Sequence, residues 1–70
     1  MIPLTFANIG QEHKIQRISG NSQVKKHLEN LGFIVGSDIT VISSLSGNVI
    51  VNVKESRIAI SKELAQKIMI

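Results

Sequence analysis

The sequence predicts a mainly β fold with one inserted helix, in which about five short strands form a small, partly closed barrel. Short stretches that alternate aliphatic and polar residues recur along the chain and are typical of half-buried strands. Only one segment, at about 22–31, has the 3.6-residue period of an amphipathic helix. Seventy residues are enough for a single domain, 1–70, and too few for two.

The N-terminal part is predicted to be extended chain. Residues 2–10 begin with a short extended piece and end in a glycine turn. Three apolar residues of this piece are expected to pack inward: Leu4, Ala7 and Ile9. A strand follows at 11–18, with Ile15 and Ile18 as its anchors. Its imperfect alternation predicts a bulge or an early end near Arg17.

The helix is predicted by an apolar stripe with the spacing i, i+4 and i+7: Val24, Leu28 and Leu31. Asn21 or Ser22 can cap its first turn by accepting a hydrogen bond from a free backbone N–H. Gly32 can adopt the left-handed conformation that ends a helix, which would place Phe33 against Leu28 in a Schellman closure. A helix of about ten residues is marginal alone, so we expect the stripe to pack on a sheet.

A β-hairpin is predicted after the helix. Its strands are expected over two alternating segments, 39–45 and 49–53. A two-residue loop would scatter the apolar residues over both faces, whereas a three-residue loop gathers them on one face. We therefore expect a three-residue loop at 46–48 that pairs Leu45 with Val49 and Val41 with Val53.

The C-terminal part is predicted to complete the barrel. A charged turn at 54–57 leads into a short strand at 58–60. Ser61 can cap a short helical turn at about 62–66. A closing strand follows at 67–70, and its exposed edge is the one feature that would pair two copies. We therefore expect a monomer or a weak homodimer.

Composition argues against several classes of protein. The chain has no cysteine, which excludes disulfides, thiolate metal sites and a cysteine nucleophile and is typical of a cytoplasmic protein. No apolar run approaches the roughly 18 residues that cross a membrane, and no signal peptide is recognisable, so we expect no membrane insertion. Asp38 is the only aspartate, and the serines are explained as caps and turn residues, so we expect no enzyme.

Nucleic-acid binding is weakly supported. The net charge is +3, and a small basic patch has three candidates: Arg17, Lys25 and Lys26. Phe6 and Phe33 are the only aromatic residues, and both are expected in the core. No stacking platform for bases then remains, so we expect no nucleic acid among the partners.

Metal binding also has only weak candidates. A metal site needs imidazole or thiolate ligands at workable spacing, backed by carboxylates. The two histidines, His13 and His27, are expected on different elements. Glu12 neighbours His13, but adjacent residues of a strand point to opposite faces. We expect no resident metal and no cofactor.

A protein-binding module is the function class that remains. Its candidate contacts come from the solvent face of the helix, the apolar link after it and the tip of the hairpin. They are Lys25, Lys26, Glu29, Ile34, Leu45, Ser46, Gly47 and Asn48.

The segment KHLENLGFIVG, residues 26–36, resembles the signature RLxxLGhxPG of the ferrous iron transport protein A (FeoA) family. The positions that carry the resemblance are Leu28, Leu31, Gly32 and Gly36. Further hydrophobic and glycine positions extend it over nearly the whole chain. Two residues depart from the pattern, because Val35 stands where the family usually has proline and His27 where it usually has arginine.

The resemblance implies an SH3-like barrel with an inserted helix. It implies a small cytosolic accessory or regulatory module of bacterial ferrous iron uptake, which binds the cytosolic part of the iron transporter, a FeoB-like GTPase-permease. The same fold occurs in metal-dependent transcriptional repressors, which leaves a transition-metal-responsive regulatory module as an alternative. A weak nucleic-acid-binding small barrel is a further alternative.

Overall fold

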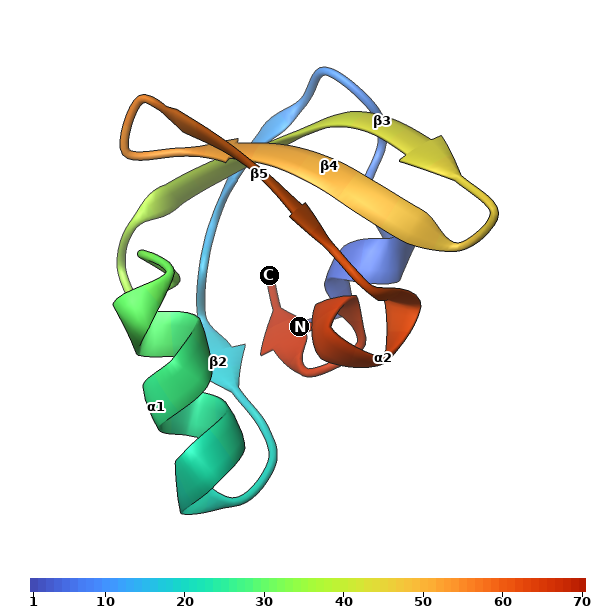
Figure 1. The fold of residues 1–70 in the computed structure, drawn as a ribbon. Helices are drawn as coiled ribbons and strands as arrows, with labels where there is room; N and C mark the ends of the chain where they lie inside the picture. The colour runs from blue at the N-terminus through green and yellow to red at the C-terminus, as the bar shows by residue number, and fades with distance from the viewer.

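The computed structural model describes residues 1–70 and contains six short strands, two α-helices and one 3-10 helix (Figure 1). The strands are β1 (Glu12–Lys14), β2 (Arg17–Ile18), β3 (Asp38–Leu45), β4 (Asn48–Val53), β5 (Ser56–Ile60) and β6 (Ile68–Met69). The helices are η1 (Leu4–Phe6), α1 (Ser22–Asn30) and α2 (Lys62–Ala65). The predicted fold class, mainly β with one main helix, is confirmed. No helix is long and apolar enough to cross a membrane.

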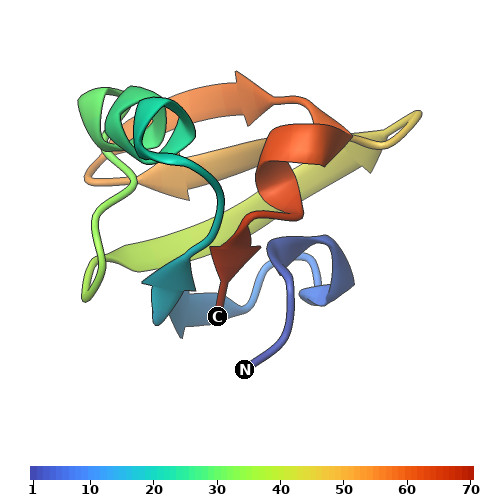
Figure 2. The ribbon, with the colours of Figure 1, turned by 90° about the horizontal axis from the view of Figure 1, so that it is seen from below.

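The strands form two antiparallel sheets. The larger sheet has the strand order β1-β3-β4-β5, and the smaller sheet pairs β2 with β6. Ile2 and Ile70 exchange two backbone hydrogen bonds of 3.0 and 2.8 Å, so the N-terminal residues lie along β6. Both chain ends therefore lie together on the same side of the larger sheet (Figures 1 and 2).

The predicted strand at 11–18 is divided into β1 and β2 by a bend. Ile15 N–H donates to the Ser37 carbonyl oxygen at 2.9 Å, and the Ile15 carbonyl accepts from Gly36 N–H at 2.8 Å. The next N–H, of Gln16, donates to the carbonyl oxygen of Met69 in β6 at 2.7 Å. The chain thus passes from the larger sheet to the smaller one at this point. The predicted early end near Arg17 is confirmed, and both predicted anchors, Ile15 and Ile18, are buried.

Helix α1 begins and ends as predicted. The Asn21 side-chain oxygen accepts from Val24 N–H at 2.9 Å and caps the first turn. At the other end, Gly32 N–H donates to Glu29 O and Phe33 N–H donates to Leu28 O, both at 2.9 Å. This pair of bonds, with φ of +105° at Gly32, is a Schellman motif. Leu28 and Phe33 are fully buried in the core, which anchors the C-terminal end of the helix.

The predicted three-residue hairpin loop is wrong. Leu45 pairs with Asn48, which leaves a two-residue loop of Ser46 and Gly47. Their φ angles are +53° and +85°, and positive φ at both central residues is the geometry of a type I′ turn. This turn follows the right-handed twist of the two strands better than a longer loop would.

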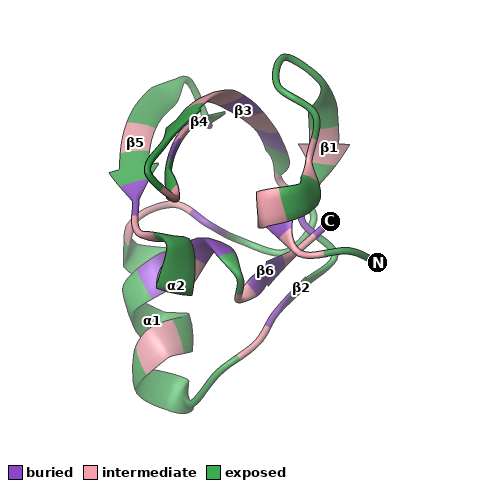
Figure 3. Ribbon diagram, turned by 90° about the vertical axis from the view of Figure 1, so that its right-hand side faces the viewer, coloured by how far each residue is buried: buried purple, intermediate pink, exposed green.

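A β-bulge in β3 keeps the apolar residues of β3 and β4 on one face, which was the reason for predicting the longer loop. The register shifts between Val41 and Ser43, so that Val41 pairs with Val51 and not with Val53. The buried residues of β3 and β4 belong to one apolar cluster, and Figure 3 shows buried positions on both strands. Leu45 lies beyond the bulge and is 77% exposed, so its predicted inward packing opposite Val49 is wrong.

The turn between β4 and β5 also has two residues, Lys54 and Glu55, so β5 begins at Ser56 rather than at the predicted residue 58. Their φ angles are +48° and +65°. A left-handed conformation costs a residue with a Cβ roughly 1–2 kcal/mol. This turn is therefore locally destabilising, and the strand pairing on either side of it holds it in place.

The N-terminal segment differs from the prediction because it coils. Residues 4–6 form the 3-10 helix η1 in place of an extended piece. Leu4 and Ala7 share one face of this turn and pack on the core, since residues three apart in a 3-10 helix eclipse each other. Phe6 lies on another face and is 71% exposed, so its predicted core position is wrong. Ile9, which precedes the turn at Gly10, is 63% exposed and also does not pack inward.

The core consists of fourteen buried residues, all of them apolar, that form one cluster. It includes Ile68 and Ile70 at the C-terminal end of the chain. Leu28 is the one fully buried residue of α1, since Val24 and Leu31 are only partly buried against the cluster. The attachment of the helix to the barrel thus depends mainly on Leu28.

We expect Leu28→Ala to lower the free energy of unfolding by about 2–5 kcal/mol, because it opens a cavity between α1 and the sheet. Urea denaturation followed by circular dichroism measures this change. Leu45→Ala is the matched control, and we expect it to change stability by less than about 0.5 kcal/mol because Leu45 is exposed. Similar losses in both variants would contradict the assignment of Leu28 to the core.

We expect Glu55→Gly to raise the free energy of unfolding by about 0.5–1 kcal/mol, because glycine removes the Cβ strain at positive φ. Thermal denaturation of the two proteins side by side checks the sign. Glu63→Gly is the control, because Glu63 lies in the right-handed helix α2, where glycine is destabilising. A loss of stability at both positions would show that the turn is not strained.

Candidate functional site

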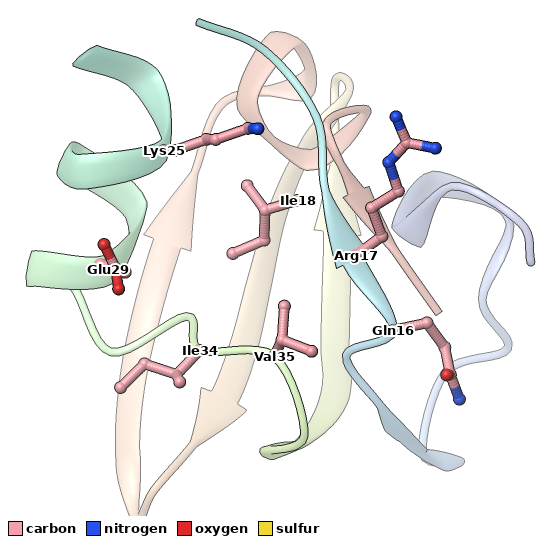
Figure 4. Close-up of a pocket in the computed structure, with 7 residues that line it drawn as sticks. All are labelled: Gln16, Arg17, Ile18, Lys25, Glu29, Ile34 and Val35. Atoms are coloured by element: carbon pink, nitrogen blue, oxygen red, sulfur yellow. The ribbon is translucent and has the colours of Figure 1, made fainter. Parts of the chain in front are cut away.

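An open groove of about 400 Å³ lies between helix α1 and strand β2 (Figure 4). Three segments far apart in the sequence line it: the bend and strand β2, the middle of α1, and the link that follows the helix. The lining residues are Gln16, Arg17, Ile18, Lys25, Glu29, Ile34 and Val35. The Schellman motif and the bend at Ile15 bring these three segments together.

The apolar part of the groove is formed by Ile18, Ile34 and Val35 (Figure 4). Ile18 is buried, whereas Ile34 and Val35 are 38% and 58% exposed. The packing of the core does not explain why the neighbouring β-branched residues Ile34 and Val35 are exposed. It leaves them available to an apolar side chain of another molecule.

A tight turn holds Ile34 and Val35 in these positions. Ser37 N–H donates to the Ile34 carbonyl oxygen at 3.0 Å, and Gly36 has φ of +92°. A positive φ at the third residue of such a turn is typical of type II, in which Gly36 avoids a Cβ clash and proline is favoured at the position of Val35. Both signature glycines, Gly32 and Gly36, therefore provide the positive φ angles at the two ends of this link.

The charged residues of the groove are not neutralised within the chain. Lys25 and Glu29 lie one turn apart on α1, and Figure 4 shows the Lys25 side chain extending across the groove toward β2. Arg17 projects from β2 on the side away from the helix (Figure 4). None of the three has an oppositely charged partner within 4.0 Å. The groove thus carries two unpaired cations and one unpaired anion.

The only ion pair of the chain joins Lys14 in β1 to Asp38 in β3, with Nζ and Oδ1 at 2.9 Å. The hydrogen bond and the charge of Asp38 raise the pKa of Lys14 above its ordinary value. Both side chains are exposed, and pairs of this kind contribute little to stability. This pair is not part of the groove.

The structure places the predicted contact residues on two separate surfaces. Lys25, Glu29 and Ile34 line the groove, and Lys26 lies beside them on the exposed surface of α1. The hairpin tip, residues 45–48, projects from the opposite side of the barrel (Figure 1). There the side chain of Lys62 packs over Gly47, 3.2 Å from where a Cβ would lie. One partner segment a few residues long cannot contact both surfaces.

Sequence reasoning missed three lining residues, Gln16, Ile18 and Val35. Ile18 was predicted as a strand anchor, and only the position of α1 shows that a groove passes over it. Arg17 was considered only for a basic patch; it lines the groove from β2, with its side chain on the side away from Lys25. The sequence feature that could have pointed to Val35 is that it stands where the signature usually has proline.

The two histidines lie apart. His13 pairs with Ile39 in the larger sheet, and its Nε2 atom is buried without a hydrogen-bond partner. His27 is exposed on α1. No group of three or more His, Cys, Asp or Glu side chains is positioned to hold a metal ion, so neither histidine belongs to such a group.

Comparison with known proteins gives a consistent family. The family model described as the FeoA domain matches residues 2–70. A curated protein of Methanocaldococcus jannaschii, provisionally named Fe(2+) transport protein A, is 39% identical over 70 residues. The aligned region is all of this chain and 85% of that protein.

Solved structures share the fold. An iron uptake regulatory protein, FeoA, matches with a TM-score of 0.89 and 31% identity over 97% of this chain and 90% of that one. FeoA of Stenotrophomonas maltophilia, crystallised with zinc and described as an SH3 domain protein, matches with a TM-score of 0.83 and 16% identity over 99% and 88%. A manganese-dependent transcriptional repressor matches with a TM-score of 0.86 and 20% identity over 94% of this chain and 38% of the repressor. The last two likenesses show the fold alone, an SH3-like barrel.

We expect Val35→Pro to raise the free energy of unfolding by about 0.4–1 kcal/mol, because proline restricts the unfolded chain and suits this turn position. The substitution removes no bond, since Val35 N–H donates no backbone hydrogen bond. Chemical denaturation measures the gain. Ser37→Pro is the control and should destabilise, because Ser37 N–H closes the turn. A clear loss of stability in Val35→Pro would contradict the turn geometry.

Proposed function

The chain belongs to the FeoA domain family, and from this premise we propose that it is a small accessory module of ferrous iron uptake that acts by protein–protein contact. The observation that carries the proposal is the groove between α1 and β2, where exposed aliphatic side chains lie beside unpaired charges. An apolar centre with a charged rim is the general anatomy of a protein contact surface.

The composition of the groove supports binding rather than catalysis. Its seven lining residues include one acid, Glu29, and no histidine, serine, threonine or cysteine. A hydroxyl or thiol nucleophile with a histidine base therefore has no candidates there. What the groove offers is shape, apolar surface and charge.

We infer that the partner is the cytosolic GTP-binding part of a ferrous iron transporter, a FeoB-like GTPase-permease. The family and the Fe(2+) transport named for its relative in Methanocaldococcus jannaschii support this inference. Such a partner places the chain in the cytoplasm, where residues 1–70 act as one domain, as a monomer or a weak homodimer.

The test is binding to the purified cytosolic part of the ferrous iron transporter from the same organism. Isothermal titration calorimetry is done without nucleotide, with GDP and with a non-hydrolysable GTP analogue. We expect saturable binding in at least one of these states, and slower uptake of radiolabelled ferrous iron in cells that lack this chain. Absence of binding in every state together with unchanged uptake overturns the proposal.

Variants then locate the contact. We expect Lys25→Glu to weaken binding about tenfold or more, because it reverses a charge at the groove. Lys62→Glu makes the same charge change on α2, beside the hairpin tip, and Leu45→Ser changes the tip itself. Both should bind like the unmodified chain. If they weaken binding and Lys25→Glu does not, the contact lies at the hairpin tip and the groove is the wrong surface.

A further inference from the structure

We propose that the groove holds its partner as an extended segment, which adds a strand to the free edge of β2 and presents an acidic side chain next to an aliphatic one. The inference rests on the proposed function in taking the groove as the contact surface. It goes further by naming the conformation and the side-chain chemistry of what binds. Strand addition at an exposed sheet edge is a general mode of peptide recognition.

The edge of β2 that faces the groove has no strand beside it. β2 pairs with β6 and with no other strand. Ser19 N–H donates to the Lys67 carbonyl oxygen, on the β6 side, at 2.7 Å. Backbone groups alternate in direction along a strand, so the N–H and C=O of Ile18 point away from β6. In Figure 1, β2 lies between α1 and the C-terminal strand, so the edge of β2 opposite β6 is on the side of α1.

Helix α1 does not satisfy this edge. Its backbone groups bond within the helix, and the groove keeps open space between Glu29 on one wall and Ile18 on the other. The turn at Gly20, between β2 and α1, is closely packed, because an added Cβ there would lie 3.1 Å from side-chain atoms of both Val24 and Lys67. A bound helix, about 10 Å wide, would leave the Ile18 backbone groups unpaired. An extended segment pairs with them directly.

Alternation of side chains sets the sequence of the bound segment. In a paired strand, residues opposite each other point to the same face. Figure 4 shows Ile18 directed toward α1 and the guanidinium of Arg17 directed away from it. The segment residue opposite Ile18 therefore points toward the apolar part of the groove, which Ile34 and Val35 complete. Its neighbour, opposite Arg17, lies beside a cation.

The charged residues around the groove indicate the second residue type of the bound segment. Arg17 and Lys25 have no acidic partner within 4.0 Å, and Glu29 is the only anion of the groove. An acidic side chain opposite Arg17 forms a cross-strand pair of opposite charge. In an alternating segment every acid lies on the Arg17 face. On the groove face, its aliphatic residues lie beside the methylene groups of Lys25, which extends toward β2 (Figure 4). A segment of alternating acidic and aliphatic residues thus matches both faces.

The probe is a capped hexapeptide of alternating aspartate and valine, titrated into the full chain labelled with ¹⁵N. We expect shifts of the backbone amides of Ile18, Lys25 and Val35, and slower hydrogen exchange at Ile18 N–H. A hexapeptide of alternating lysine and valine should bind about tenfold or more weakly, because its charges repel Arg17. Equal binding of the two peptides overturns the charge assignment.

Backbone pairing has its own control. Two further aspartate–valine peptides carry N-methyl groups at every second amide, in opposite phases, which leaves the side chains unchanged. We expect one phase to lose binding and the other to keep it, because only alternate amides face β2. If neither phase loses binding, the segment does not add as a strand and the proposal is wrong.

Variants separate this inference from the proposed function. Arg17→Glu should weaken the aspartate–valine peptide about tenfold, whereas Lys62→Glu should not. If the transporter part binds but the peptides do not shift Ile18, the inference fails and the proposed function stands. If the peptide binds at Ile18 and the transporter part does not bind, the proposed function fails and the mode of recognition stands. Shifts of Ile18 that follow protein concentration without peptide would show that a second copy occupies the edge, and would overturn the inference.

Discussion

The burial of Leu28 and Phe33 in the core at the end of α1 is the constraint on which the rest of the structure depends. The Schellman bonds that place them there require the left-handed backbone of Gly32. With both side chains in the core, the chain leaves the helix in one direction only. The next residues, Ile34 and Val35, are therefore held at the surface, and they form one end of the groove.

The bend at Ile15 positions β2, which forms the opposite wall of the groove. By passing the chain from the larger sheet to the smaller one, it turns what would be one long strand into two short ones. β2 then has β6 on one side and a gap on the other. The same bend that closes the core around Ile15 thus creates an unpaired edge beside α1, and natural proteins seldom leave such an edge open without covering or using it.

The fold itself does not decide what this chain binds. A manganese-dependent repressor has the same SH3-like barrel as part of a longer chain, and one fold commonly carries unrelated functions. The side chains around the groove make the difference. Ile18 and Val35 provide apolar surface, and Arg17 and Lys25 provide charge without an internal partner. Val35, Arg17 and Lys25 contribute little to the core, so their arrangement is explained better by contact with another molecule.

The sequence by itself determined α1 with a cap at Asn21 or Ser22, its end at Gly32 and the burial of Leu28, because these depend on local hydrogen bonds and on a 3.6-residue period; the structure decided for Asn21 as the cap. It also determined most inward-facing strand residues, since alternation is local. Only the tertiary structure decided the register of β3 against β4, because the bulge near Val41 allows a tight turn that simple alternation rules out. It also decided the exposure of Phe6, which follows from coiling against the core. The tertiary structure likewise decided the groove, because Arg17, Lys25 and Val35 line one pocket only when the bend and the helix end pack on one barrel.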